Sequence, residues 1–164
     1  MNQRTKLILS LLAVIAVAVM IFMFSAQQGD ESSKLSGAIS DWVLRRIVPG
    51  YATMTPSERR PYLRQWSFYI RKLAHFSEFA LLAVTLVRFF SYALRHRMLW
   101  PQLLAAWVAA TVYAGTDELH QMFVAGRGPA LTDVCIDSAG ALTGACAALL
   151  GLKILRRVKG EARE

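Results

Sequence analysis

The sequence feature that most restricts how this chain can fold is an apolar stretch close to its start. Residues 7–24 contain only one polar side chain, that of Ser10. A helix of this length can cross a hydrocarbon core of about 30 Å. A signal peptide also has a basic start and an apolar run, but this run is longer than usual and no clear cleavage motif precedes Gln27. The stretch therefore favours a retained membrane span over a signal peptide.

The remainder of the chain is also too apolar for an ordinary soluble domain. Of its 164 residues, 55% are hydrophobic, and the net charge is +8. The cations lie beside apolar runs, which indicates contact with anionic headgroups and control of topology rather than nucleic-acid binding. Cys135 and Cys146 fall on one predicted helix about 16 Å apart, which is too far for a disulfide.

Three further apolar stretches predict membrane-spanning helices, at residues 73–94, 98–116 and 134–152. We therefore predict one all-α domain over residues 1–164, a polytopic membrane bundle with four transmembrane helices. The fourth span contains Gly140 and Gly144, a GxxxG pattern that lets another helix backbone approach closely. This pattern places the fourth span at the centre of the bundle.

The insertion at residues 27–72, between the first and second spans, predicts helices at the membrane surface. Its first part has one apolar face at helical spacing, and its second part, residues 61–69, interleaves aromatic rings with arginines. A soluble loop with exposed rings is the alternative. The residues of the apolar face are Leu35, Ile39, Trp42, Val43 and Ile47.

Basic segments predict the orientation of the chain in a bacterial inner membrane. Arg4 and Lys6, the RHR connection at residues 95–97 and the basic C-terminal tail favour the cytoplasm. Both termini are then cytoplasmic and the insertion is extracytoplasmic, although the insertion itself carries eight Lys and Arg.

Four spans bring most of the unusual polar residues to one membrane face. The end of the first span, the start of the second, the end of the third and the start of the fourth all lie on the same side. Charged and amide side chains are rare at such positions and indicate a functional site. They are Gln27, Arg71, His75, Glu78, Asp117, Glu118, His120, Gln121, Arg127, Asp133 and Asp137.

One interpretation of this group is a catalytic site. His75 or His120 would act as acid and base, and the carboxylates of Glu78 and Asp117 would orient them. The same four residues could instead hold a divalent metal ion, although their spacing matches no standard metalloprotease motif. The sequence itself requires no cofactor.

A second interpretation is a ligand-binding site without turnover. Arg71 and Arg127 suit a phosphate or carboxylate, because a guanidinium can donate two parallel hydrogen bonds. In the third interpretation, the polar groups satisfy one another as a network that fixes the helices. Further ligand contacts in the second interpretation are Gln27, Glu118, Gln121, Asp133 and Asp137.

Three segments together resemble the VanZ family of small bacterial membrane proteins. They are FSAQ, RKLAHFSEFALLA and YAGTDELHQMFVAGRGPALTDVCIDSAGALTG, which lie within residues 24–144. The chain departs from the family pattern at Phe79, where tyrosine is frequent, and at Ala26, where FSSQ is common. The positions that match the family pattern are Gln27, His75, Glu78, Asp117, Glu118, His120, Gln121, Arg127, Asp133, Asp137 and Gly140.

The resemblance implies a role in the cell envelope. The family takes its name from an accessory protein of glycopeptide resistance that lowers susceptibility to teicoplanin, and this history supplies no mechanism. We therefore predict a polar pocket that binds or modifies an anionic lipid, a lipid-linked precursor or an amphiphilic glycopeptide antibiotic. Its partners would be membrane lipids or such precursors. A non-catalytic scaffold is the alternative.

Overall fold

The protein is all-helical over the residues that the structure describes. A computed structural model describes residues 1–27, 29–94 and 99–161. In these residues it contains five α-helices and one short 3₁₀ turn, without strands, which confirms the all-α part of the predicted fold class. The elements are α1 (Gln3–Ser25), α2 (Gly29–Ile47), η1 (Tyr51–Thr53), α3 (Pro56–Ala93), α4 (Trp100–Gln121) and α5 (Leu131–Glu161).

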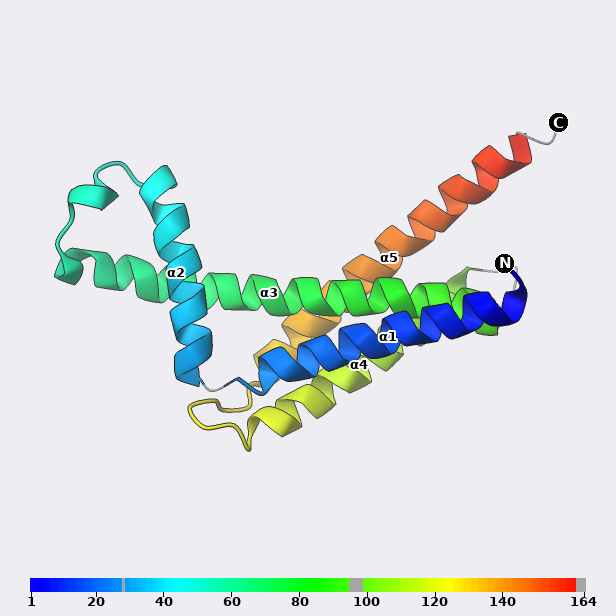
Figure 1. Cartoon of the computed structure of the whole chain (residues 1–164), viewed down its shortest axis with the longest axis horizontal. Helices are drawn as coiled ribbons and strands as arrows, with labels where there is room; N and C mark the ends of the chain where they lie inside the picture. Colours follow the sequence, from blue (N-terminus) through cyan, green and yellow to red (C-terminus); the bar gives the residue numbers. More distant parts are fainter. Residues whose placement is uncertain (28, 95–98, 162–164) are drawn as a thin grey trace.

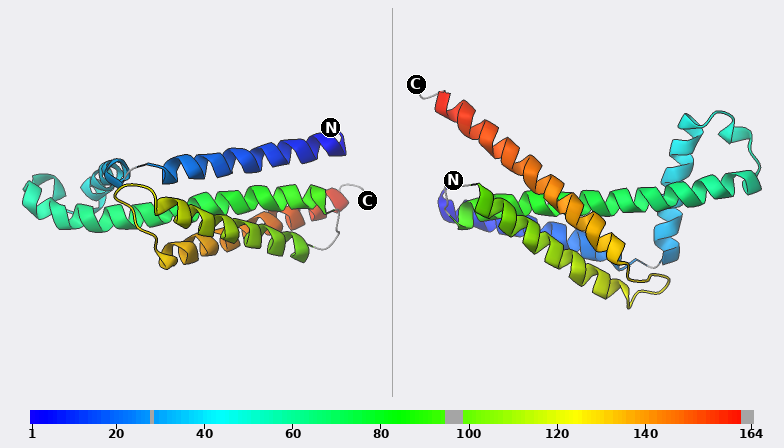
Figure 2. Two further views of the ribbon diagram at one scale, coloured as in Figure 1. Left: turned by 90° about the horizontal axis from the view of Figure 1, so that it is seen from below. Right: turned by 180° about the vertical axis from the view of Figure 1, so that it is seen from behind.

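Helices α1, α3 and α4 run alongside one another, and α5 crosses α3 and then diverges from it (Figure 1). α4 runs back along the bundle towards the end where α2 lies, and both chain ends lie at the opposite end (Figure 2). α2 crosses α3 instead of running along it. The connections at the α2 end therefore bring together the end of α1, the end of α4 and the start of α5.

Three of the described helices are long and apolar enough to cross a membrane. They are Gln3–Ser25, Pro56–Ala93 and the Leu131–Leu155 part of α5. The third predicted span, residues 98–116, corresponds to α4, which is not among these candidates. The RHR connection at residues 95–97, which was used to predict orientation, lies outside the described residues, as do the side chains of Arg156 and Lys159.

α3 is one continuous helix over two elements that the sequence pattern predicts as separate. We expected a short surface segment and then a span from residue 73, but one helix runs from Pro56 to Ala93. It begins with a capping box, in which Thr55 accepts a hydrogen bond from the Glu58 N–H and the Glu58 carboxylate accepts one from the Thr55 N–H. Pro61 removes only one backbone hydrogen bond close to the helix start, so the helix continues through it.

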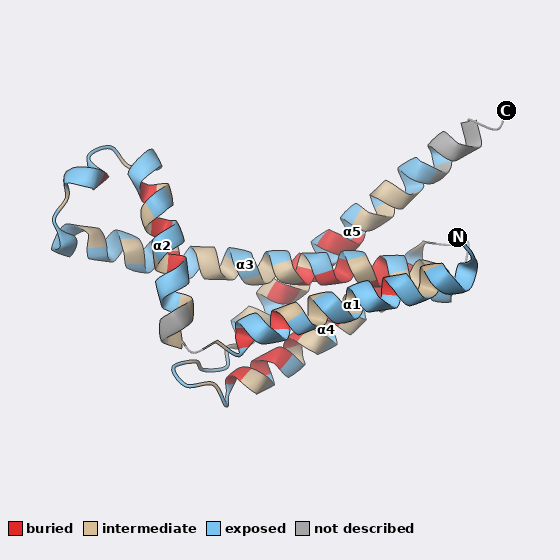
Figure 3. Ribbon diagram, in the orientation of Figure 1, coloured by how far each residue is buried: buried red, intermediate tan, exposed pale blue. Residues whose placement is uncertain are grey.

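The contact between α3 and α5 depends on two glycines. A Cβ at Gly140 would overlap the carbonyl oxygen of Phe76, and a Cβ at Gly144 would overlap that of Ala80. The two backbones are therefore in direct contact, as GxxxG patterns permit. Around this crossing the buried core is rich in alanine on α3, α4 and α5 (Figure 3). The glycines serve packing within the chain.

α2 packs on α3 through small residues and turns most of its apolar face outwards. Ser40 is fully buried and its hydroxyl lies 3.2 Å from that of Ser67 on α3. By contrast, Leu35, Trp42 and Ile47 are each more than half exposed. The amphipathic pattern is present, but its apolar side does not face the protein core.

Candidate ligand-binding site

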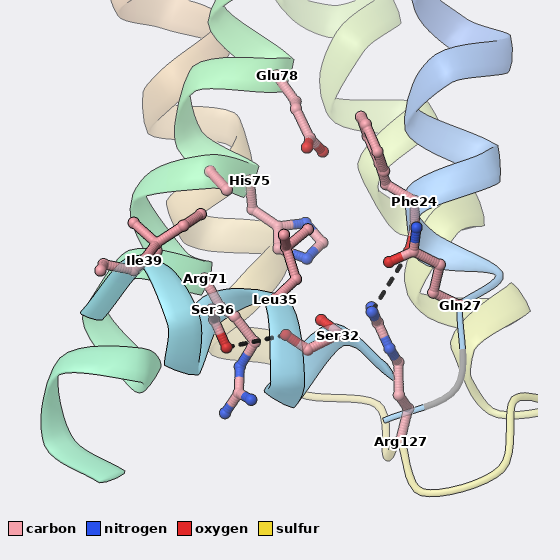
Figure 4. Close-up of a pocket in the computed structure, with 12 residues that line it drawn as sticks. Phe24, Gln27, Ser32, Leu35, Ser36, Ile39, Arg71, His75, Glu78 and Arg127 are labelled. Carbon is pink, nitrogen blue, oxygen red and sulfur yellow. Dashed lines mark hydrogen bonds between the residues drawn. The ribbon is translucent and has the colours of Figure 1, made fainter. Parts of the chain in front are cut away.

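Two adjoining cavities lie between α2, α3 and the loop from α4 to α5. The first has a volume of ≈ 240 Å³ and the second ≈ 230 Å³. They share Ser32, Arg71, His75 and Arg127, so we describe them together as the cleft. In Figure 4, His75 and Glu78 project from α3, and Arg127 rises from the loop towards Phe24 and Gln27.

The first cavity combines apolar walls with a few charged groups. Its walls come from the end of α1, one side of α2 and the middle of α3. The apolar residues are Phe24, Leu35, Ile39, Ile70 and Ala74, and the charged or amide residues are Gln27, Arg71, His75, Glu78 and Arg127.

The second cavity is lined mainly by polar groups and glycines. Its residues are Gly29, Ser32, Ser33, Phe68, Arg71, Lys72, His75, Gln121, Gly126, Arg127, Gly128 and Asp133. The cleft therefore has an apolar half and a polar half, with the shared arginines and His75 between them.

The two arginines keep hydrogen-bonding capacity for a ligand. Arg71 donates from Nη1 to the Ser33 hydroxyl at 2.9 Å, and Arg127 donates from Nη2 to the Phe24 carbonyl at 3.4 Å. None of the ion pairs among the described residues includes either arginine, whereas Lys72 pairs with Asp133. Burial lowers the pKa of Arg127 and the Asp117 carboxylate opposes this shift, but a guanidinium stays protonated in proteins.

The loop that carries Arg127 is fixed by backbone contacts. Gly126 has φ 76°, a left-handed conformation that favours glycine. The N–H of Gly29 donates to the Ala125 carbonyl at 3.2 Å, and a Cβ at Gly29 would lie 2.5 Å from the Gly126 carbonyl oxygen. The Glu118 carboxylate accepts a hydrogen bond from the Ala130 N–H at 2.8 Å. These contacts attach the loop to the start of α2 and to α4.

A buried hydrogen-bonded group ties α1 to α4 beside the cleft. The Asp117 Oδ2 atom accepts hydrogen bonds from the Ser25 hydroxyl at 2.7 Å and from Gln121 Nε2 at 2.9 Å. The side chains of all three residues are buried. Nearer the middle of the bundle, the Tyr113 hydroxyl donates to the Ala18 carbonyl at 2.7 Å. The hydrogen bonds of Asp117 therefore hold α1 against α4.

The two candidate histidines lie in different surroundings. His75 lines both cavities, and its Nδ1 lies 3.8 Å from Oδ2 of the buried Asp137. The ring of His120 instead packs on the ring of Phe22, with centroids 4.6 Å apart. His75 is therefore the histidine that a ligand in the cleft would meet.

The predicted site residues divide into those that line the cleft and those around it. Asp117, Glu118, His120 and Asp137 are not among its lining residues. No three His, Cys, Asp or Glu side chains among the described residues gather closely enough to hold a metal ion, so the set of His75, Glu78, Asp117 and His120 is not assembled as ligands. The lining residues are Gln27, Arg71, His75, Glu78, Gln121, Arg127 and Asp133.

Sequence reasoning missed Lys72 and the contribution of α2. Lys72 was not among the predicted site residues, although its place next to Arg71 offered a signal. Ser32, Ser33, Leu35 and Ile39 enter the cleft because α2 folds back across α3. No local pattern in the sequence reports that fold-back.

Comparison with protein-family models supports the resemblance noted from the motifs. The model described as VanZ/LLP1 matches residues 10–154, which is most of the chain. The chain belongs to the VanZ/LLP1 family. All residues that line the cleft lie inside the region that matches the VanZ/LLP1 model. Searches of curated proteins and of solved structures found no match.

Proposed function

We propose that the cleft of this VanZ/LLP1-family membrane protein binds the phosphate-bearing head of an anionic lipid or a lipid-linked envelope precursor. The observation that carries this proposal is the position of Arg71 and Arg127. Both line the polar and the apolar half of the cleft, and neither takes part in an ion pair among the described residues. Two guanidinium groups at such a boundary suit a phosphate whose ester continues into an apolar chain.

The two halves of the cleft suit the two halves of an amphiphile. Lys72, Ser33 and Gln121 add donors in the polar half, while Phe24 and Ile39 supply apolar contacts in the other. The two cavities together have the size of a small-ligand site, for which about 300–1,000 Å³ is usual. A head group with the first part of its chain would fill them.

The proposal places the cleft at the extracytoplasmic face of the inner membrane. α4 runs along the bundle between the ends reached by α3 and α5, and both chain ends lie opposite α2. This arrangement favours four crossings, in which the exposed apolar side chains of α4, such as Leu104, Val108 and Val112, would face lipid. Arg4 and Lys6 then stay in the cytoplasm.

On this proposal α2 lies in the headgroup layer. Its exposed Leu35, Trp42 and Ile47 would enter the outer leaflet, where tryptophan is favoured. Arg46, whose guanidinium lies 3.8 Å from the Trp42 ring centroid, would meet lipid phosphates. Leu35 and Ile39 then connect the outer leaflet to the cleft.

A non-catalytic scaffold is the second candidate function. The contacts of Asp117 with Ser25 and Gln121, and of Glu118 with Ala130, favour it because they hold helices and loop in place. If the bound amphiphile is also modified, His75 and Glu78 are the acid and base groups that line the cleft.

A binding assay tests the proposed function. The purified protein in phosphatidylcholine nanodiscs is titrated with fluorescent phosphatidylglycerol, with a polyprenyl phosphate and with teicoplanin. We expect Arg71→Ala and Arg127→Ala each to weaken binding of both phosphate lipids by about tenfold or more, because each removes a charge-assisted contact. Arg71→Lys and Arg127→Lys should recover part of the affinity.

Arg64→Ala is the matched control, because Arg64 is an exposed arginine on α3 outside the cleft lining. Competition by inorganic phosphate would show that the phosphate itself is recognised. Equal affinities of wild type and both arginine variants would contradict the proposal, as would binding of teicoplanin alone.

A further inference from the structure

Asp137 on α5 is a buried carboxylate that has no hydrogen-bond partner among the described residues. Its side chain is 0% exposed, and neither of its oxygens accepts a hydrogen bond within the described part of the chain. One turn earlier on the same helix, Asp133 is paired with Lys72. An ionised carboxylate inside a helical bundle is costly unless a cation or a proton compensates it. We therefore expect a group near Asp137 that can provide a positive charge or a proton.

His75 is the group that faces this carboxylate. Its Nδ1 lies 3.8 Å from Asp137 Oδ2 and is itself buried, with no hydrogen-bond partner in the part of the chain that the structure describes. This distance is too long for a hydrogen bond but within the range of an ion pair. The two groups are held opposite each other by the backbone contact of Gly140, three residues after Asp137, with Phe76, the neighbour of His75. Their proximity is thus built into the crossing of α3 and α5.

The same imidazole reaches the cleft. His75 lines both cavities together with Arg71 and Arg127, and its side chain is 18% exposed. With Nδ1 turned towards Asp137, Nε2 is the ring nitrogen left to meet a ligand. A protonated imidazole donates from both nitrogens, so it can interact with a buried carboxylate through one nitrogen and donate a hydrogen bond to a ligand oxygen through the other.

Other charged groups near the ring come from α3, α4, α5 and the loop between α4 and α5. Asp117 on α4, Asp133 on α5, Lys72 on α3 and Arg127 in the loop act on His75 electrostatically. Arg71 and Glu78 lie one turn away on its own helix and line the same cavity. A bound phosphate would offset the two arginines and add an anion beside the ring, which favours the imidazolium form.

We propose that His75 is a third phosphate ligand of the cleft, that it acts as the imidazolium, and that Asp137 is its buried counter-ion. This inference rests on the proposed function and adds to it that the ligand binds together with a proton. Binding should be strongest at a pH where the ring is protonated in the complex. It should weaken as the pH rises and the ring loses that proton, because histidine titrates near neutral pH.

The test uses a ligand whose own charge does not change. The phosphodiester of phosphatidylglycerol does not titrate between about pH 5.5 and pH 8, so a change in affinity over this range reports on the protein. With full-length protein in phosphatidylcholine nanodiscs, we expect binding about tenfold tighter at pH 5.5 than at pH 8. Calorimetry in buffers of different ionisation enthalpy should show proton uptake on binding.

Substitutions assign the effect to His75. His75→Gln should bind phosphatidylglycerol with nearly the same affinity at both pH values, close to the weak value of the wild type at pH 8. Asp137→Asn should reduce the pH dependence, because it removes the counter-ion. Arg64→Ala, outside the cleft lining, should keep it. Glu78→Gln removes the carboxylate of the first cavity, so it should change the affinity at each pH but leave binding tighter at pH 5.5 than at pH 8. If Asp137→Asn does not accumulate as folded protein, the comparison of His75→Gln with Glu78→Gln decides the question.

The outcomes separate this inference from the proposed function. Binding that is independent of pH in the wild type, yet lost in Arg71→Ala and Arg127→Ala, would overturn the role of His75 and leave the proposed function standing. A pH dependence that disappears in Glu78→Gln and persists in His75→Gln would also overturn it. Absence of phosphatidylglycerol binding at either pH would overturn both.

Discussion

Replacing Gly144 with alanine is expected to destabilise the folded bundle by about 2–3 kcal/mol, the upper part of the range for overpacked sites. The added Cβ would overlap the backbone carbonyl of Ala80, which cannot rotate away as a side chain can. α3 and α5 would have to separate along their closest contact, and neighbouring core residues such as Ala83 and Ala145 would lose packing. Thermal unfolding in detergent, followed by size-exclusion chromatography, measures the loss. Gly144→Leu should leave little folded protein.

Gly151→Ala provides the control on the same helix. A Cβ at Gly151 meets no atom within 4 Å. Because alanine is favoured over glycine in a helix by about 1 kcal/mol, this variant should be neutral or slightly more stable. A loss of stability at Gly151 as large as that at Gly144 would show that helix flexibility, and not the contact with α3, explains the glycine requirement.

Several features of the fold could be predicted because they depend on local pattern. The length of the apolar run at residues 7–24 predicts α1, and the spacing of Gly140 and Gly144 predicts a close helix contact. The structure confirms the all-helical class and places that contact between α5 and α3. Helix directions along the bundle then bring polar ends together, as in the cleft residues His75 and Arg127.

Other features depend on contacts between distant segments, which a pattern does not report. Pro61 and the turn-like residues around it suggest a break, but the capping box of Thr55 with Glu58 begins α3 before that proline. The apolar stripe of α2 predicts a helix at the membrane surface, but it does not report how that helix packs on the protein, where Ser40 contacts α3 and Trp42 is exposed. The packing of α2 on α3 depends on small residues that meet where the two helices cross.

The roles of the polar residues are the least predictable part. Asp117 and His120 on α4 and His75 on α3 lie at the same end of the bundle, so spacing alone cannot separate ligand contacts from structural ones. The structure distinguishes these residues by the groups that each side chain contacts. Asp117 accepts hydrogen bonds from Ser25 and Gln121, whereas His75 lines the cleft.

Replacing Asp117 with leucine is expected to destabilise the protein by about 3 kcal/mol, because buried donors that lose their acceptor cost about 1–3 kcal/mol each. Leucine has the same branched shape with slightly larger methyl groups, so the space stays filled, but the Ser25 hydroxyl and the Gln121 amide would both lose their partner. Asp117→Asn should reduce the stability much less, because its one amide oxygen can accept hydrogen bonds from both donors. Thermal unfolding in detergent measures both variants.

A double-mutant cycle shows whether Asp117 acts through this network. Ser25→Ala removes one donor, so the combination of Ser25→Ala with Asp117→Leu should be less destabilising than the two single effects added, by about 1 kcal/mol. Phosphatidylglycerol binding by Asp117→Asn should stay within about twofold of the wild type, since this variant keeps the acceptor that joins α1 to α4. Additive effects on stability, or loss of binding in a stable Asp117→Asn protein, would instead place Asp117 among the groups that act on the ligand.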